Sequence, residues 1–267
     1  MSIFNQDQIT ARELILQTAY GAKEGHIGSA LSIVDLLLVL YQRILHIKDI
    51  NDLERDRFIL SKGHAALALY VILYMSKKIT QSDLASYCQN GSSLSAHPNK
   101  KQLGIEFTTG SLGQGVTMAV GAALAAKIQG SARRIFCLLS SAELNEGSSW
   151  EAIQFAAAQK LNNLVFILDD NGRQAMGESK KIIDLEPVDQ KIEDFGWQAT
   201  NLKKGHDYDD ILQSFKRIIF NNQKPKFIVA HTTIGKGISF MEDSLEWHYK
   251  SLAKEELDRA LEELSHA

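Results

Sequence analysis

Residues 135–172 read IFCLLSSAELNEGSSWEAIQFAAAQKLNNLVFILDDNG, and the class of fold can be inferred from this segment. Two short, continuously apolar runs, residues 135–139 and 164–168, flank a segment with helical spacing over residues 149–161. Apolar runs that do not alternate with polar residues are typical of strands covered on both faces. The stretch therefore predicts a strand, a helix and a second strand of a parallel sheet.

The same alternation continues in both directions along the chain. Further apolar runs occupy residues 58–60 and 227–230, and helical patterns occupy residues 65–75, 112–128 and 208–220. Together they predict an α/β fold with a doubly wound, mostly parallel sheet and helices on both faces. In such sheets ligands bind beyond the carboxyl ends of the strands, so these ends are the first places to look for a site.

Two helices are expected before the first strand. Residues 7–22 place apolar side chains at helical spacing after Asp7, which we take as the N-cap. Ser32 followed by Asp35 resembles a capping box, and the apolar run 33–45 after it predicts a buried helix. That run is interrupted by polar residues and is too short to span a bilayer.

Composition excludes several classes of protein. The chain has 267 residues, 45% hydrophobic and 23% charged, which is typical of a globular protein. With Lys+Arg 29 against Asp+Glu 32, the net charge of −3 gives no field that would attract nucleic acid. Cys88 and Cys137 lie far apart, so neither a disulfide framework nor a zinc knuckle is expected.

Domain organisation and location follow from the termini and the linkers. No Gly/Ser-rich linker or repeat divides the chain, so one domain over residues 1–267 is expected, with residues 252–267 as a charged C-terminal helical tail. The N-terminus lacks the basic and apolar regions of a secretory signal. We therefore expect a cytoplasmic protein without a membrane partner.

Polar side chains follow each predicted strand. The segments are Ser61-Lys62-Gly63-His64, the run from Ser140 to Gly147, Asp169-Asp170-Asn171-Gly172, and His231. Three more histidines, His26, His97 and His248, lie beside glycine, proline or tryptophan. Alone, each feature is ambiguous, since a histidine in a turn is usually a satisfied polar residue and Asp-Asp-Asn-Gly is a common turn. The glycines at 110, 113 and 115 fit either a tight loop or an anion site at a helix N-terminus.

The order and spacing of five blocks are more specific. The chain resembles the transketolase family in the following segments: GHIGSALSIVDLLLVLY (25–41), DRFILSKGHAALALY (56–70), HPNKKQLGIEFTTGSLGQGVTMAVGAALAAK (97–127), LNEGSSWEAIQFAAAQKLNNLVFILDDNG (144–172) and TTIGKGISFMEDSLEWH (232–248). The resemblance runs from about residue 8 to about residue 250. It ends where full-length transketolases continue into their pyrimidine-binding and C-terminal domains, so the chain resembles the N-terminal, thiamine-diphosphate-binding subunit of a split transketolase.

The resemblance implies roles for the histidines. His26 and His97 would face the hydroxyls of the donor sugar. His64 and His248 would contact the diphosphate of the cofactor, with His248 also near the reacting carbonyl. Neutral imidazoles suit these roles because they both donate and accept hydrogen bonds.

It also implies cofactor and partner contacts outside the histidines. Gly110, Ser111 and Leu112 would lie along the thiamine diphosphate. Glu146 matches the residue that binds the catalytic glutamate of the pyrimidine domain across the subunit interface. The segment containing Ser141, Ala142 and Glu143 would lie against the diphosphate.

The implied metal is Mg²⁺ or Ca²⁺, held by Asn171 and the backbone carbonyl of Arg173. Amide and carbonyl oxygens suit such a hard cation. The family motif Gly-Asp-Gly is replaced here by Ser140-Ser141-Ala142, so Ser141 stands in place of the carboxylate ligand. Ala142 adds a methyl group where a glycine approaches the diphosphate.

Three functions are compatible with these residues. In the first, the chain works with a C-terminal transketolase subunit, as an α2β2 heterotetramer, to transfer a ketol unit between sugars or sugar phosphates. In the second, it is a non-catalytic structural or regulatory subunit that has lost metal and cofactor binding. In the third, it belongs to a thiamine-dependent enzyme acting on a 2-oxo acid, which would have no need of His26 and His97. Whether Glu143 or Asp170 replaces the missing carboxylate is left open by the sequence.

Overall fold

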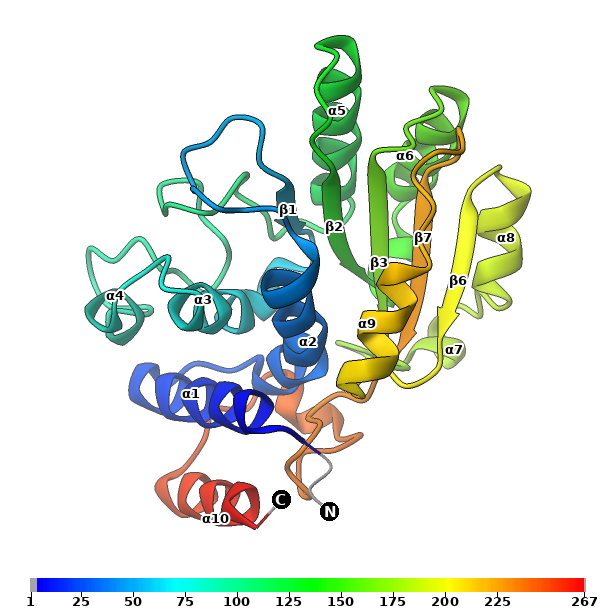
Figure 1. Cartoon of the computed structure of the whole chain (residues 1–267). Coiled ribbons are helices and arrows are strands. Elements are labelled where there is room, and N and C mark those ends of the chain that lie inside the picture. Colours follow the sequence, from blue (N-terminus) through cyan, green and yellow to red (C-terminus); the bar gives the residue numbers. More distant parts are fainter. Residues whose placement is uncertain (1–3, 267) are drawn as a thin grey trace.

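The computed structural model describes residues 4–266 and has a five-stranded parallel sheet at its centre (Figure 1). Along the sheet the strands are β1 (Arg57–Leu60), β2 (Ile135–Ser140), β3 (Leu164–Asp170), β7 (Lys226–His231) and β6 (Gln198–Leu202). Every neighbouring pair is parallel. The four strands expected from the apolar runs are confirmed, and with them the sheet class.

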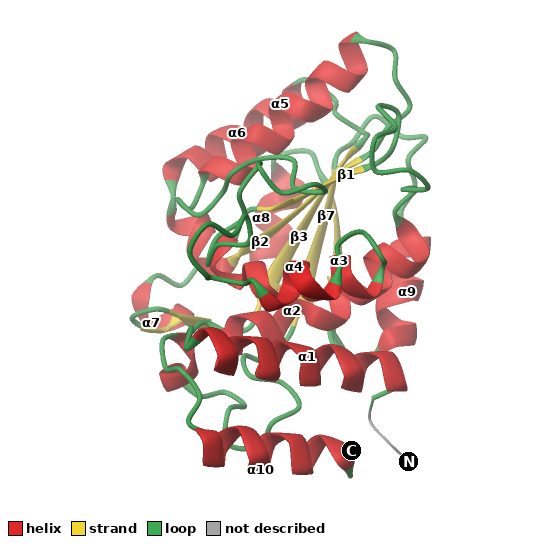
Figure 2. Cartoon of the chain, turned by 90° about the vertical axis from the view of Figure 1, so that its left-hand side faces the viewer, coloured by secondary structure: helices red, strands yellow, loops and turns green. Residues whose placement is uncertain are grey.

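Helices cover both faces of this sheet because its side chains alternate between two apolar clusters. Cys137 and Leu139 pack in the cluster under α5, α6 and α8, whereas Phe136 and Leu138 pack in the cluster under α1, α2, α3 and α9. Figure 2 shows these two groups of helices on opposite sides of the strands. The helices are α1 (Gln6–Ala22), α2 (Ile27–Val39), α3 (Ala66–Met75), α4 (Gln81–Ala85), α5 (Gln114–Ile128), α6 (Gly147–Ala158), α7 (Ser179–Ile182), α8 (Val188–Asp194), α9 (Tyr208–Lys216) and α10 (Lys254–Ser265).

The beginning of α1 corrects the predicted cap. Asn5, and not Asp7, is the N-cap. The Asn5 side chain accepts a hydrogen bond from the Gln8 backbone N–H at 3.0 Å, and Gln8 Oε1 accepts one from the Asn5 N–H at 3.0 Å. Two orphan donors of the first turn are thus satisfied, which explains why the helix begins one residue before Asp7.

The beginning of α2 was also predicted wrongly. The helix starts at Ile27, so Ser32 and Asp35 lie buried in its interior and do not cap it. Asp35 accepts hydrogen bonds from the Arg12 guanidinium at 2.8 and 2.6 Å. Burial raises the pKa of Asp35, but the charge of Arg12 more than compensates and leaves that pKa well below its usual range. The spacing of Ser32 and Asp35 therefore reflects two polar residues that form buried contacts, and not a helix cap.

The early start of α2 also removes the length argument against a membrane span. With the π-helical turn η1 (Leu40–Ile44) that follows it, the helix covers Ile27–Ile44 and is long and apolar enough to cross a bilayer. Of this span, 78% is buried inside the fold. Its apolar character is that of a helix at the centre of a protein core.

Several elements had no clear sequence signal. The edge strand β6, the short helices α4, α7 and α8, and the hairpin of β4 (Arg173–Gln174) and β5 (Gly177–Glu178) were not predicted. The expected C-terminal helix is α10, which lies against α1 and buries Leu257, Ala260 and Leu264. Because α10 is packed in this way, it is part of the fold; Ala267 lies outside the described residues.

Candidate active site

A cavity of about 220 Å³ lies at the carboxyl ends of β1, β2 and β3. This is the edge of the sheet at which the sequence placed the polar segments. Its lining residues come from the ends of these strands and the loops after them, from the start of α2, from the connection between α4 and α5, and from the segment before α10. They are His26, Ser29, Lys62, His64, His97, Gly110, Leu112, Ser140, Ala142, Asn171, Arg173, Gln174, Ala175, His248 and Tyr249.

Four histidines from separate segments meet in this cavity. The ring centroid of His26 lies 5.4 Å from that of His64, 6.3 Å from His97 and 5.3 Å from His248. The rings of His64 and His248 are 5.3 Å apart. The structure therefore brings together all four histidines that the sequence analysis singled out.

Close backbone packing holds two of these histidines. His26 has a left-handed backbone (φ 59°) at the N-cap of α2, and its N–H donates to the carbonyl of His248 at 3.2 Å. A Cβ atom added at Gly25 would lie 2.3 Å from the Tyr249 carbonyl oxygen, so only glycine allows this approach. A side chain at Gly110, which has φ 148°, would collide with the ring of His97 at 2.8 Å.

The cluster is uncharged at neutral pH. Burial, followed by the positive charges of neighbouring groups, lowers the pKa of His26 and His64, and burial also lowers that of His97. The pKa of His248 is lowered to about 4 by burial and by His26 and Lys62. The Nδ1 atoms of His26 and His248 are buried without a hydrogen-bond partner among the described residues. Neutral imidazoles with free ring nitrogens are suited to bind a ligand rich in hydroxyl groups.

A buried ion pair lies beneath the cavity. Lys62 Nζ is 2.5 Å from Asp169 Oδ2, and the two side chains are 1% and 0% exposed. Asp169 also accepts hydrogen bonds from Ser32 at 2.7 Å, from Asn171 Nδ2 at 2.9 Å and from Thr232. These contacts join α2 to the ends of β1, β3 and β7 and fix the floor of the cavity.

The predicted metal-binding residues offer neutral oxygen atoms. Asn171 Oδ1 accepts a hydrogen bond from the Arg173 N–H at 3.0 Å, which fixes the amide with its oxygen toward the Arg173 backbone. Ser140 Oγ is buried and has no partner among the described residues. Within residues 4–266, no group of three or more His, Cys, Asp or Glu side chains is arranged to hold a metal ion.

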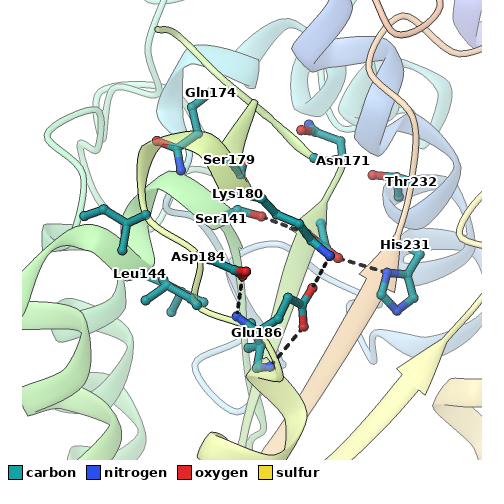
Figure 3. Close-up of a pocket in the computed structure, with 15 residues that line it drawn as sticks. Ser141, Leu144, Asn171, Gln174, Ser179, Lys180, Asp184, Glu186, His231 and Thr232 are labelled. Carbon is teal, nitrogen blue, oxygen red and sulfur yellow. Dashed lines mark hydrogen bonds and ion pairs between the residues drawn. The ribbon is translucent and has the colours of Figure 1, made fainter. Parts of the chain in front are cut away.

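Ser141 lies in a neighbouring cavity of about 380 Å³ that shares Asn171 and Gln174 with the first (Figure 3). Its Oγ donates to Asp170 Oδ1 at 3.1 Å, and Asp170 Oδ2 lies 2.9 Å from His231 Nδ1. The hydrogen bond with Asp170 raises the pKa of His231. Burial raises the pKa of Asp170, but its contacts with His231 produce a net lowering. Asp170 therefore places a charged carboxylate directly beside Ser141.

Glu143 faces the protein interior. Its carboxylate is 0% exposed and accepts hydrogen bonds from Ser61 Oγ at 2.5 Å, from the Gly113 N–H at 2.9 Å and from the Ser140 N–H at 3.3 Å. In this structure the carboxylate is held by these three donors and Glu143 does not line the histidine cavity, so its role at the cofactor stays a prediction. Asp170 also lies outside that cavity, beside Ser141 and His231.

Glu146 and Ser111 lie at the surface. Both side chains are exposed, one at the N-cap of α6 and the other just before α5. An added Cβ at Gly113 would lie 3.0 Å from Glu146 Cβ, so the loop before α5 runs directly beside the start of α6. Neither residue lines the histidine cavity, so the predicted contact of Ser111 with the cofactor and that of Glu146 with a partner stay predictions.

Sequence reasoning missed several residues of the cavity. Lys62 stood in the segment after β1 but was assigned no role, although a lysine between a strand and a Gly-His turn was a usable signal. Ser29, Gln174 and Ala175 carried no local signal. Tyr249 follows His248 directly and was also assigned no role.

Comparison with known proteins agrees with this geometry. Residues 5–266 match the family described as "Transketolase, thiamine diphosphate binding domain". The chain is 41% identical over 256 residues to an apulose-4-phosphate transketolase subunit of Actinobacillus succinogenes, covering 95% of this chain and 92% of that one. It is 36% identical to "6-deoxy-6-sulfo-D-fructose transketolase subunit SqwG" of Clostridium sp. (strain MSTE9), covering 95% and 93% of the two chains.

Solved structures give the same relationship. The crystal structure of the transketolase from Campylobacter jejuni superposes with a TM-score of 0.89 at 33% identity, covering 98% of this chain and 43% of that one. The transketolase from Leishmania mexicana has a TM-score of 0.89 at 28% identity, with 99% and 42% covered. The chain thus spans about two fifths of the length of these solved transketolases.

Proposed function

Because this chain belongs to the transketolase family, in the part that binds thiamine diphosphate, we propose that it is the N-terminal subunit of a split transketolase. It transfers a two-carbon ketol unit from a ketose to an aldose, both as sugars or sugar phosphates. Relatives named as transketolase subunits that it matches over more than nine tenths of their length support this proposal. The observation that carries it is the cavity in which four neutral histidines converge.

The residues of the cavity fit thiamine diphosphate. Seven buried side-chain polar atoms lack partners among the described residues, and three of them, His26 Nδ1, His248 Nδ1 and Ser140 Oγ, belong to residues that line this cavity. Unsatisfied buried polar atoms are rare in proteins, so three of them at one cavity are what a site for a polar ligand would show. Thiamine diphosphate, when bound, supplies the carbon nucleophile that ketol transfer requires. His64, His248, Gly110, Leu112, Ala142 and Asn171 are the lining residues that would hold it.

The histidines bind and orient the sugar in this proposal. His26 and His97 each present a ring that can donate one hydrogen bond and accept another, as a hydroxyl group does. Because their pKa values are lowered, both rings keep this capacity throughout the neutral range. The ring of His248 lies 5.3 Å from the rings of both His26 and His64, and in this proposal it exchanges a proton with an oxygen of the substrate.

His26→Ala and His97→Ala are expected to lower turnover without unfolding the chain. Each removes a hydrogen bond to the reacting substrate, a loss of about 1–3 kcal/mol, or roughly five- to 150-fold in rate. The measurement is kcat with the partner subunit present, together with the circular dichroism spectrum of each variant. His46→Ala is the matched control, because His46 lies outside this cavity. Full activity in both variants would contradict the assignment.

A divalent cation, Mg²⁺ or Ca²⁺, is the second ligand that we propose. Asn171 and the Arg173 carbonyl supply oxygen atoms to it, and Ser141 supplies a hydroxyl in place of a carboxylate. Neutral oxygens bind a hard cation more weakly than a carboxylate does. The alternative is a non-catalytic subunit that no longer binds metal or cofactor, and the replacement of the carboxylate by Ser141 is the observation that favours it.

Ser141→Asp is expected to tighten magnesium-dependent binding of thiamine diphosphate about tenfold, or 1.4 kcal/mol. The new carboxylate lies beside that of Asp170, and a bound cation relieves the repulsion between them. Adding Ala142→Gly is expected to tighten binding further by removing a methyl group from the cavity wall. The dissociation constant is measured by calorimetry with the partner subunit, with and without Mg²⁺.

Ser141→Asn is the control for this prediction, because it has the size of aspartate without the charge. If it tightens binding as much as Ser141→Asp, the effect is not a charge effect. If neither the wild type nor the Ser141→Asp/Ala142→Gly variant binds the cofactor, the non-catalytic alternative holds.

The partner that we propose is a C-terminal transketolase subunit carrying the pyrimidine-binding domain, in an α2β2 heterotetramer. The exposed position of Glu146 at the start of α6, beside the loop that leads into α5, supports this proposal. The same helices expose large apolar side chains, with Ile128 at 77% and Phe155 at 44%.

A further inference from the structure

We propose that Tyr249 is a specificity-determining residue that places its aromatic ring against the C–H face of the donor sugar at the mouth of the histidine cavity. The proposal rests on the proposed function, because it concerns the substrate of that same site. The evidence for the proposal is the position of the Tyr249 side chain, the exposure of that side chain and the chemistry of the residues that line the cavity.

Tyr249 stands at the mouth of the cavity. Its ring centroid lies 4.8 Å from that of His248 and 5.6 Å from that of His26, and its side chain lines the cavity with theirs. At the same time the residue is 63% exposed, so a large part of the ring faces open space. A side chain in this position touches whatever enters the cavity.

The backbone of Tyr249 is fixed although its ring is exposed. The main chain passes so close to Gly25 that no Cβ fits between them, and the Tyr249 N–H donates to the Glu246 carbonyl at 3.2 Å. Neither apolar core cluster includes the ring. The fold therefore holds this residue in place without using its side chain for core packing, which is the condition for a side chain that serves a ligand.

The chemistry of the wall indicates what the ring contacts. Ten of the fifteen lining residues have polar side chains, namely the four histidines, Ser29, Lys62, Ser140, Asn171, Arg173 and Gln174. These donors and acceptors suit a ligand with many hydroxyls. A sugar also has faces made of C–H groups, and the flat ring of Tyr249 offers the large apolar surface that such a face needs.

A contact with the partner subunit is the competing explanation for the exposed ring. Met176, at the tip of the β4–β5 hairpin, is 80% exposed and follows Ala175, which lines the same cavity. If the exposed residues at the mouth of the cavity only bind the partner subunit, substitutions of Tyr249 and of Met176 should both weaken assembly. If Tyr249 binds sugar, its effect should appear in the KM for the donor and not in assembly.

The test compares Tyr249→Phe, Tyr249→Leu, Tyr249→Ala and the control Met176→Ala, each in complex with the C-terminal subunit. Donors are apulose 4-phosphate, xylulose 5-phosphate and fructose 6-phosphate, and KM and kcat are measured with the best of them. Losing an aromatic contact should raise the donor KM about three- to tenfold in Tyr249→Ala and Tyr249→Leu. Tyr249→Phe should stay within about twofold, since it keeps the ring. The dissociation constant of thiamine diphosphate and the concentration of partner at half-maximal assembly should not change.

Each other outcome has a definite meaning. An unchanged donor KM in Tyr249→Ala overturns the proposal. A donor KM in Tyr249→Leu that equals that of Tyr249→Phe also overturns the proposal, because the size of the side chain, and not its aromatic ring, would then explain substrate binding. Weaker assembly in both Tyr249→Ala and Met176→Ala with an unchanged KM assigns the ring to the partner interface and also overturns it. If the wild-type complex turns over none of the donors, the proposed function itself fails, and this inference fails with it.

Discussion

A preparation of this 267-residue polypeptide by itself is expected to show no ketol transfer, and addition of a C-terminal transketolase subunit is expected to create the activity. The chain matches the thiamine-diphosphate-binding domain of the family and spans 40% of human transketolase and 43% of the Campylobacter jejuni enzyme. The rest of those chains has no counterpart among these residues. We therefore expect the chain without its partner to have no measurable turnover, and not merely a reduced one.

The structure gives the physical reason for this dependence. The histidine cavity opens at a surface where Tyr249 is 63% exposed, and the proposed contact residue Glu146 is exposed as well. An open site leaves water around the reacting groups, whereas a second chain would close it and strengthen each polar contact inside. In the proposed function, closure by a partner therefore comes before activity.

The measurement titrates a fixed amount of this chain with increasing amounts of its partner, with thiamine diphosphate, Mg²⁺ and the donor and acceptor sugars present. Turnover should rise and saturate at equal amounts of the two chains, and sedimentation should show two copies of each. The partner alone serves as the control and should be inactive. Robust turnover by this chain alone would refute the prediction.

Lys62→Met is expected to lower the free energy of unfolding by about 3–5 kcal/mol. The substitution removes the charge that lies 2.5 Å from Asp169 and leaves a buried carboxylate without a counter-charge. Three hydrogen-bond donors remain on Asp169, but they do not neutralise it. Since the stability of a domain is about 5–15 kcal/mol, this loss is a large part of the total.

Urea unfolding followed by circular dichroism measures this effect. Lys254→Met is the matched control, because Lys254 forms an ion pair with Asp258 in which both side chains are 58% exposed. An exposed pair is worth at most about 1 kcal/mol, so the control should change little. Lys62→Met/Asp169→Asn should recover part of the loss by removing the unpaired charge. If Lys62→Met and Lys254→Met lower the free energy of unfolding equally, burial does not explain the contribution of the Lys62–Asp169 pair to stability.

Most of the sheet could be predicted from the sequence. The runs at 58–60, 135–139, 164–168 and 227–230 are apolar at every position because both faces of these strands are buried, and this signal is local. The edge strand β6 gives no such signal, since most of its side chains are partly exposed. The short β4–β5 hairpin likewise leaves no periodic pattern to detect.

Helix starts were less predictable than helix positions. Asn5 and Asp7 are both good caps, and only the reciprocal contact with Gln8 decides between them. Ser32 and Asp35 have the spacing of a capping box, but their partners, Asp169 and Arg12, come from β3 and α1. A polar pair at cap spacing has the same appearance in the sequence whether its partners are local or distant.

The class of fold and the four histidines of the cavity were predictable from the sequence, because buried strands and the family blocks around His26, His64, His97 and His248 can be recognised in short segments. The tertiary structure alone decided which other side chains join them. It turned Glu143 inward onto Ser61, placed Asp170 beside Ser141 and left Tyr249 exposed at the mouth of the cavity. The physical reason is that the direction and burial of a side chain depend on the register of neighbouring strands and on partners far away in the chain, and local spacing encodes neither.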